Sequence, residues 1–370
     1  MQPKNHKIWR FLLPIMMASI GVVALLLPNL FRDRPDISER YAREIFPIIS
    51  APYLWVNSLF PFSLTEILVL SILPVAVLFV ILWIRFLRRS KDRYVFFYRT
   101  IVVIAVLFSI NATTYSLFHG ILYTRYPLAS NISLNDEQRS PEELEEVTRW
   151  LLDATNTARA SVREDSTGVM TFFEPTDQIM KDADGAMRLA ADAFPVLAGH
   201  SARAKPVMLS AYWSYTGITG MYFPFFMEAN VNIDAPDVDL PFTACHELAH
   251  LRGIAREQDA NLAAFLACLS SNQPSFQYSG YQYALLYCLD DLYYANPELH
   301  REFLSEISDG TWRDWEAKTA YWDRIEGPVR EVSSNVNDSF LKANNQTEGV
   351  RSYSMVTDLI IDYYFQYIKE

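Results

Sequence analysis

Cysteine, glycine and basic residues are scarce in this chain of 370 residues, and each shortage excludes a class of protein. Three cysteines without a CxxC pair exclude a disulfide scaffold and a cysteine-rich zinc finger. Twelve glycines exclude a collagen-like protein, and a hydrophobic content of 51% excludes a disordered chain. The formal net charge of -11 argues against a nucleic-acid partner, because such a surface needs clustered Lys and Arg.

The charge is distributed unevenly along the chain. Residues 1–119 contain 13 Lys and Arg against 6 Asp and Glu, whereas residues 120–370 contain 19 against 37. The first part is therefore basic and very apolar, and the second part is acidic. This asymmetry predicts a membrane anchor over residues 1–123, followed by a separate domain over residues 124–370.

Three apolar runs in the first part are candidates for membrane-spanning helices. They cover residues 11–31, 65–84 and 100–122, and a span needs about 20 mostly apolar residues. The third run is interrupted by Asn111 and His119, so a buried soluble helix is the alternative there. The first run has the basic start of a signal peptide, but no cleavage site of small residues follows it. We expect three spans, with the lipid bilayer as a partner.

Basic residues between the second and third runs set the expected orientation. Residues 85–99 contain six Lys and Arg against one Asp, whereas the charges after the first run are balanced. The positive-inside rule then places this loop and the N-terminus in the cytoplasm. Three spans place residues 124–370 outside the membrane, whereas two spans would place them inside.

The composition of residues 124–370 predicts an α+β domain that is mostly helical. A capping box at residues 140–143 opens one helix. Later helices are expected at about residues 242–252, 255–271, 278–294, 298–308, 311–322 and 353–368. The stretch from Val207 to Ile233 is rich in Tyr, Phe and Val and is broken by glycines. It predicts a small sheet of two short strands around a turn.

The second of these strands, Glu228 to Ile233, allows two interpretations. As an edge strand it would present free backbone groups that can pair with an extended peptide. The strand precedes the motif described next by one loop, as that role requires. The alternative is a plain structural strand in which Asn230 and Asn232 are solvated.

One motif points to chemistry. Residues 246–250 read HELAH, an HExxH pattern, and Gly253 after it predicts a helix stop. Residues four apart lie on the same face of a helix, so His246 and His250 can bind one metal ion. Glu247 is then placed to take a proton from a water held at the metal. A surface helix with two incidental histidines is the alternative.

The helix expected after Gly253 offers the third ligand. Glu257 and Asp259 differ by about 200° around a helix, so only one of them can face the HExxH helix. We expect Glu257 to be the ligand. Asn261 lies one turn further on and shares that face, so its amide is expected to hydrogen-bond a ligand imidazole.

The combined motif resembles the HExxH…ExxAN signature of gluzincin-type zinc metallopeptidases. The resemblance implies a zincin-like domain that binds Zn2+ through His246, His250 and Glu257. It also implies peptide hydrolysis with Glu247 as the general base. The substrate would be a peptide or protein near the outer face of the membrane.

The whole chain also resembles a family of bacterial membrane proteins with a few N-terminal spans. The matching segments, besides the metal motif, are residues 123–128, 220–232 and 341–353. This implies a multi-pass protein of the bacterial cell membrane, but it implies no particular substrate. The chain departs from the family pattern at Leu251 and Asp259, neither of which is an expected ligand.

Two further hypotheses concern the site. Hydrolysis needs a hydrogen-bond donor besides the metal, and Tyr353 is the first choice for it, with Tyr222 second. The rival function is a zinc-binding sensor or receptor module, because a structural zinc site is usually closed by four protein ligands. Cys245 or Asp259 would be the fourth ligand in that case. His119 is expected to have no role at the site.

Overall fold

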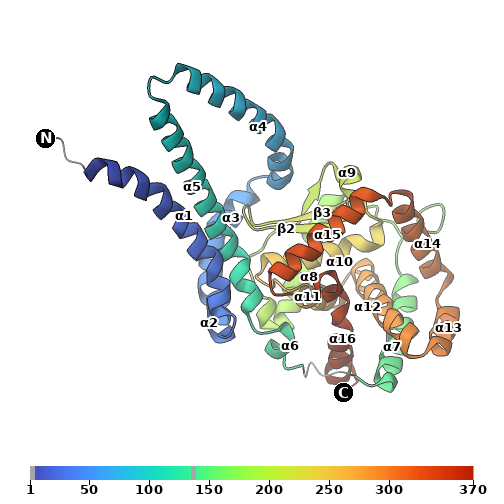
Figure 1. Ribbon diagram of the computed structural model, residues 1–370. Helices are drawn as coiled ribbons and strands as arrows, with labels where there is room; N and C mark the ends of the chain where they lie inside the picture. The colour runs from blue at the N-terminus through green and yellow to red at the C-terminus, as the bar shows by residue number, and fades with distance from the viewer. Residues whose placement is uncertain (1–4, 135–138, 370) are drawn as a thin grey trace.

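Three long apolar helices form an arm on one side of the molecule (Figure 1). The computed structural model describes residues 5–134 and 139–369. The arm consists of α1 (Asn5–Phe31), α4 (Leu64–Arg89) and α5 (Arg93–Phe118). All three are helices long and apolar enough to cross a membrane, as the three apolar runs predicted. At 1.5 Å per residue, a helix of 26 residues is about 39 Å long, which exceeds the ~30 Å apolar core of a bilayer.

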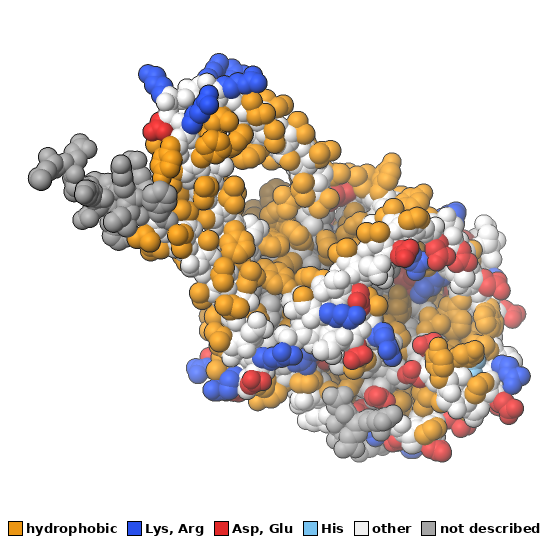
Figure 2. Space-filling model, viewed as in Figure 1, with side chains coloured by type: hydrophobic (Ala, Val, Ile, Leu, Met, Phe, Trp, Pro, Cys, Tyr) orange, Lys and Arg blue, Asp and Glu red, His pale blue; other side chains and the backbone are white. Residues whose placement is uncertain are grey.

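Helices α1 and α5 pack along each other, whereas α4 stands apart. Close approach within the first pair depends on small residues, because Gly21 lies against Phe108 and the Ser109 hydroxyl donates to a carbonyl of α1. No residue in the apolar window of α4 is buried, and Trp83 of α4 contacts Phe96 and Phe97 of α5 beside the basic loop. Figure 2 shows hydrophobic side chains along the arm and basic side chains at its tip.

A helical segment that the sequence did not predict connects the arm to the rest of the chain. It consists of α2 (Pro35–Arg40), the π-helical turn η1 (Tyr41–Ile45) and α3 (Phe46–Ser58). Phe46 and Leu54 point into the main core. The sequence predicts no helix in this segment, because prolines and balanced charges obscure the helical spacing of its apolar residues. It is instead part of the globular fold.

The remainder of the chain is a compact arrangement of helices, as predicted. The helix that opens with the capping box is α7, and that cap is formed. The helix α15 was not predicted, although Gly327 and Pro328 mark its start. The described helices are α6 (Leu128–Asn131), α7 (Pro141–Arg159), α8 (Thr176–Ala193), α9 (Ser210–Ser214), α10 (Leu240–Leu251), α11 (Glu257–Ser270), α12 (Pro274–Ala295), α13 (Pro297–Glu306), α14 (Asp309–Arg324), α15 (Pro328–Ala343) and α16 (Thr357–Tyr363).

A small sheet of three strands completes the α+β fold. Its strands are β1 (Lys205–Val207), β2 (Gly220–Phe223) and β3 (Glu228–Asn232), in the order β1-β3-β2. β3 pairs with β1 in parallel and with β2 in antiparallel orientation. The prediction that this strand is an edge strand is therefore wrong, because the short strand β1 covers its second side.

The predicted exposure of the β3 side chains is also wrong, because all five residues of the strand are buried. The reason is the position of α4, whose first turn lies on this strand. The Glu228 carboxylate accepts hydrogen bonds from the backbone amides of Leu64 and Thr65, at 3.0 and 2.8 Å. The Ser63 hydroxyl donates to Asn230 at 2.6 Å. The sheet thus caps the start of a candidate membrane span.

The main hydrophobic core extends across the predicted boundary between residues 123 and 124. Phe46 and Leu54 from α3 and Phe118 from α5 belong to the same buried cluster as α10 and α11. A buried ion pair joins the two parts as well, because Arg125 binds Glu39 through two hydrogen bonds of 3.0 Å. Anchor and domain share one core in the described part of the chain.

Candidate metal centre

The HExxH pattern lies on α10, a helix whose twelve residues are all buried. The predicted stop at Gly253 is present, since this glycine has φ +88°, a conformation that L side chains rarely adopt. The amide of Ile254 donates back to the Ala249 carbonyl at 3.1 Å, which closes the last turn. This tight reversal returns the chain toward α10 within a few residues.

Three ligand atoms converge where α11 begins. Glu257 is the first residue of α11, and its Oε2 lies 3.2 Å from His246 Nε2 and 3.4 Å from His250 Nε2. The two imidazole nitrogens are 3.0 Å apart. The structure therefore brings together the three predicted ligands as a group that could hold a metal ion.

The donor atoms of this group fit a bound cation. The Nδ1 of His250 lies 2.7 Å from the Ile254 carbonyl, which fixes the ring so that Nε2 faces the other ligands. Glu257 Oε2 is buried but accepts no hydrogen bond of good geometry. A buried carboxylate oxygen is normally satisfied, so the free lone pairs are those that a metal ion would use.

The pKa values of the ligand side chains also favour a bound cation. Burial lowers the pKa of His250, but the charge and hydrogen bond of Glu257, together with the charge of Glu247 and the Ile254 carbonyl, outweigh burial and raise this pKa to about 9. Burial raises the pKa of Glu257, but the neighbouring histidines outweigh it and hold this pKa well below its usual range. The buried carboxylate thus favours a positive charge at the two histidines. A divalent cation would replace that positive charge.

Glu247 lies next to the ligands and is 4% exposed. Burial raises its pKa to about 7, although the charges of His246 and His250 oppose this shift. Its Oε2 has no hydrogen-bond partner among the described residues. A carboxylate with these properties can accept a proton near neutral pH.

Gly220, at the start of β2, makes room for this carboxylate. A Cβ atom at position 220 would lie 2.4 Å from Glu247 Oε1 and 2.7 Å from its Cγ. No larger residue fits unless Glu247 moves. The sequence analysis quoted this glycine only as part of a family-like segment, because nothing local in the sequence links it to residue 247.

The free edge of the sheet, β2, faces Glu247. Hydrogen-bonded pairs alternate along an antiparallel ladder, and the Thr219 carbonyl accepts a bond from the Asn232 amide on β3. The register therefore turns the backbone groups of Gly220 and Tyr222 away from β3. A backbone hydrogen bond from Tyr222 reaches the Glu247 carboxylate. The edge strand that the sequence assigned to β3 is β2.

Tyr353 and Asn261 lie together beside the ligands, but not in the predicted arrangement. The Tyr353 ring stacks on His246 with centroids 6.2 Å apart, and burial followed by the charge of Glu257 raises its pKa. The Asn261 amide donates to the Tyr353 carbonyl at 2.8 Å and to the Tyr287 hydroxyl at 3.2 Å. The predicted bond from Asn261 to a ligand imidazole is thus replaced by bonds that hold Tyr353 in place, because η5 (Gly349–Val356) packs against α11.

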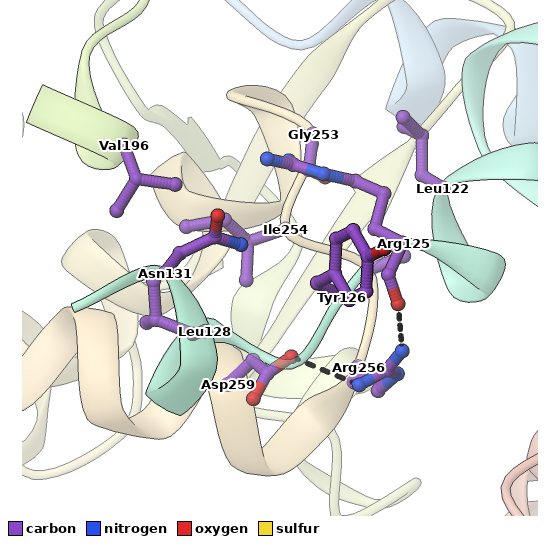
Figure 3. Close-up of a pocket in the computed structure, with 11 residues that line it drawn as sticks. Leu122, Arg125, Tyr126, Leu128, Asn131, Val196, Gly253, Ile254, Arg256 and Asp259 are labelled. Carbon is purple, nitrogen blue, oxygen red and sulfur yellow. Dashed lines mark hydrogen bonds and ion pairs between the residues drawn. The ribbon is translucent and has the colours of Figure 1, made fainter. Parts of the chain in front are cut away.

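The polar groups of Tyr222 and Asp259 are engaged outside the ligand group, although the Tyr222 ring lies 6.3 Å from the His250 ring. The Tyr222 hydroxyl is occupied by the Phe118 carbonyl and the Met227 sulfur, at 3.2 and 2.9 Å. Asp259 lies toward Arg256, with their charged atoms 3.7 Å apart. Figure 3 shows the Asp259 carboxylate next to Arg256, among the residues that line a separate pocket. Asp259 is not part of the ligand group.

His119 lies close to the centre, which the sequence did not predict. It follows the last residue of α5, and its ring centroid lies 6.4 Å from that of His250. The Nε2 of His119 is 3.1 Å from the Tyr123 hydroxyl, while its buried Nδ1 has no partner among the described residues. The centre is thus lined by the end of a candidate membrane span as well as by α10 and α11.

Helix α15 covers the centre, and a polar pocket adjoins it. Phe340 of α15 stacks on His119 at 6.0 Å between centroids, and Arg330 packs against Gly217 just before β2. The Gln346 side chain after α15 accepts a bond from the Glu257 amide at 3.2 Å. The pocket has a volume of about 230 Å³ and is lined by Tyr123, Arg256, Gln258, Asn344, Asn345, Gln346, Thr347, Glu348, Ser352 and Met355.

Comparison with known proteins gives a family but no function. No curated protein and no solved structure matches the chain. One family model, DUF3810, described as a protein of unknown function, matches residues 41–361. That range contains α10, α11, the sheet and the Tyr353 segment. The chain therefore belongs to the DUF3810 family.

Proposed function

We propose that this protein is a membrane-bound zinc metallopeptidase of the gluzincin type that hydrolyses a peptide or protein near the outer face of the membrane. The observation that carries the proposal is the convergence of His246, His250 and Glu257 beside the buried carboxylate of Glu247. Two imidazoles and one carboxylate on paired helices are the ligand set of catalytic zinc sites in metallopeptidases. The helix order and the edge strand β2 support a zincin-like fold.

Zn2+ is the metal that best suits these donors. Two imidazole nitrogens with one carboxylate oxygen match zinc, whereas an all-oxygen set would suit magnesium or calcium. When bound, the ion would act as a Lewis acid toward the scissile carbonyl and lower the pKa of water. Cys245, considered as a fourth ligand, donates weakly toward the Ala183 carbonyl at 3.9 Å and lies outside the ligand group.

The side chains around the metal have separate roles in the proposed reaction. Glu247 removes a proton from the attacking water and returns it to the leaving nitrogen, which its raised pKa favours. The edge of β2 that faces away from β3 aligns an extended substrate through backbone hydrogen bonds. Tyr353, stacked on His246, donates a hydrogen bond to the developing oxyanion.

The proposal is tested on the zinc-loaded full chain in detergent, with a mixed library of quenched fluorescent peptides. Glu247→Gln is expected to keep its zinc and to lower peptide cleavage by about 10³-fold, since it removes the general base. Equal cleavage by the variant and the unmodified chain contradicts the proposal. Glu326→Gln, an exposed position on the same domain, is the matched control.

The Tyr353→Phe variant tests the hydrogen-bond donor independently of the general base, in the same assay. Loss of the hydroxyl is expected to lower turnover by about a hundredfold, with unchanged zinc content, because such a donor typically contributes 10²–10³-fold.

A zinc-binding sensor is the second candidate function, and it is favoured by the burial of all three ligands. Zinc binding without cleavage of any library peptide would support the sensor.

Orientation across the membrane is part of the proposal. The basic loop between α4 and α5 supports an orientation with the tip of the arm in the cytoplasm and the metal centre outside, by the positive-inside rule. A reporter enzyme that works only outside the cytoplasm is expected to be active when fused after residue 370 and inactive when inserted at Ser90. The reverse pattern would place the centre in the cytoplasm and contradict an extracytoplasmic peptidase.

A further inference from the structure

Large apolar side chains are exposed on two segments of the globular part. In α3, Ile48 is 72% exposed and Trp55 is 66% exposed. In the segment from Met208 to Tyr215, which contains α9, Met208 is 77% exposed and Tyr212 is 73% exposed. In water such residues are usually buried, so a contiguous group of them indicates a surface that contacts something apolar.

Both segments are attached to the start of α4. The Glu66 carboxylate, in the first turn of α4, accepts hydrogen bonds from the amides of Met208 and Leu209 at 2.9 and 2.8 Å. On the other side, α3 leads into α4 through a connection of five residues, 59–63. Figure 1 shows the root of α4 between α3 and α9. We call the exposed apolar residues of α3 and of segment 208–215 the collar.

The collar lies where α4 enters the bilayer. No residue in the apolar window of α4 is buried, and the apolar run begins at residue 67, in the first turn of that helix. If α4 spans the membrane, as its length and composition allow, lipid surrounds it from there on. Trp and Tyr are the side chains that membrane proteins place at the level of the headgroups. The Glu66 carboxylate lies at the same level, but both of its oxygens accept hydrogen bonds from backbone amides of segment 208–215.

We propose that the collar is immersed in the headgroup region of the outer leaflet and that phospholipid is its partner. Its apolar and aromatic content fits the boundary between headgroups and acyl chains. Its attachment to α4 through Glu66 holds it at that level. This proposal concerns a binding surface and does not depend on the reaction at the metal centre.

The collar is rigidly connected to the metal centre. The Asn57 amide at the end of α3 donates to the Met227 carbonyl at 2.7 Å, in the turn between β2 and β3. β2 leads from this turn to Gly220, three residues from Phe223, which is about 10 Å of extended strand. The collar therefore holds Glu247 close to the membrane surface. If the proposed peptidase function holds, its substrates are segments next to a membrane anchor.

The test places a fluorescent label on the collar of the full chain in phosphatidylcholine–phosphatidylglycerol vesicles. The three native cysteines are buried, so Tyr212→Cys and Trp55→Cys can be labelled separately with an environment-sensitive nitrobenzoxadiazole dye. Tyr294→Cys is the matched control, since Tyr294 is 78% exposed and lies near the end of α12, away from the arm.

Lipids with a nitroxide at the headgroup level are expected to quench the two collar labels at least threefold more than the control label. A water-soluble quencher is expected to quench the control label more than the two collar labels. Equal lipid quenching of the collar and control labels overturns the proposal, and so does full access of the soluble quencher to Tyr212→Cys. Neither readout depends on zinc or on peptide cleavage, so failure of the peptidase function would leave the result unchanged.

Discussion

Replacing Glu257 with alanine is expected to empty the metal site, whereas replacing Asp259 with asparagine is expected to leave it filled. Glu257 Oε2 lies 3.2 and 3.4 Å from the two imidazole nitrogens, while the Asp259 carboxylate points to Arg256. The four protein ligands of a structural zinc site together contribute a metal-binding free energy of about 10–16 kcal/mol. One protein ligand therefore corresponds to roughly 3 kcal/mol, or at least a hundredfold in affinity.

The measurement is zinc per chain by plasma mass spectrometry, followed by competition with a chromogenic chelator. Full-length protein in detergent is used for both variants, because the core includes parts of the arm. His250→Ala serves as a positive control for an empty site. If Glu257→Ala retained zinc and Asp259→Asn lost it, the residue of α11 assigned as the ligand would be wrong. The gluzincin interpretation would then be wrong as well.

The ligand group could be predicted from the sequence because every step in it is local. The spacing of His246 and His250 fixes one helix face, and Gly253 fixes the end of that helix. The angle between Glu257 and Asp259 around α11 then selects one carboxylate. These relations depend on helix geometry and on a turn of a few residues, not on the rest of the fold.

The parts of the site that could not be predicted come from distant segments. Gly220 approaches Glu247 only because β2 lies at the edge of the sheet, and the sheet order depends on β1, a strand of three residues with no clear signal. His119 reaches the centre from the end of a span that was considered only as a membrane helix. Asn261 was given an imidazole partner because the neighbouring Tyr353 segment could not be foreseen.

Expression of residues 124–370 alone is expected to give no stable, folded domain. The truncation removes Phe46, Leu54, Phe118, Ile121 and Leu122, all of which are buried in the core that contains α10 and α11. Each fully buried side chain of this size contributes about 1.5–3 kcal/mol. Their combined loss, about 10 kcal/mol, is comparable to the entire free energy of unfolding of a typical domain, about 5–15 kcal/mol.

The truncation also leaves buried charges without their partners. Glu228 loses the amides of Leu64 and Thr65, and Arg125 loses Glu39 while it still binds the Gly253 carbonyl beside the metal motif. Breaking a buried ion pair by removing one partner typically costs 3–5 kcal/mol. The turn that brings Glu257 to the histidines would therefore lose its support even if the fragment stayed compact.

Zinc content and thermal unfolding of the fragment, compared with the full chain in the same detergent, measure this dependence. The fragment is expected to bind less than a tenth of the zinc of the full chain, to melt without a cooperative transition and to bind a hydrophobic dye. A fragment with one zinc per chain and a cooperative transition would show that the boundary at residue 124 separates two independent units. The expected failure instead means that the metal centre forms only when the arm is in place, because α3 and the end of α5 belong to its core.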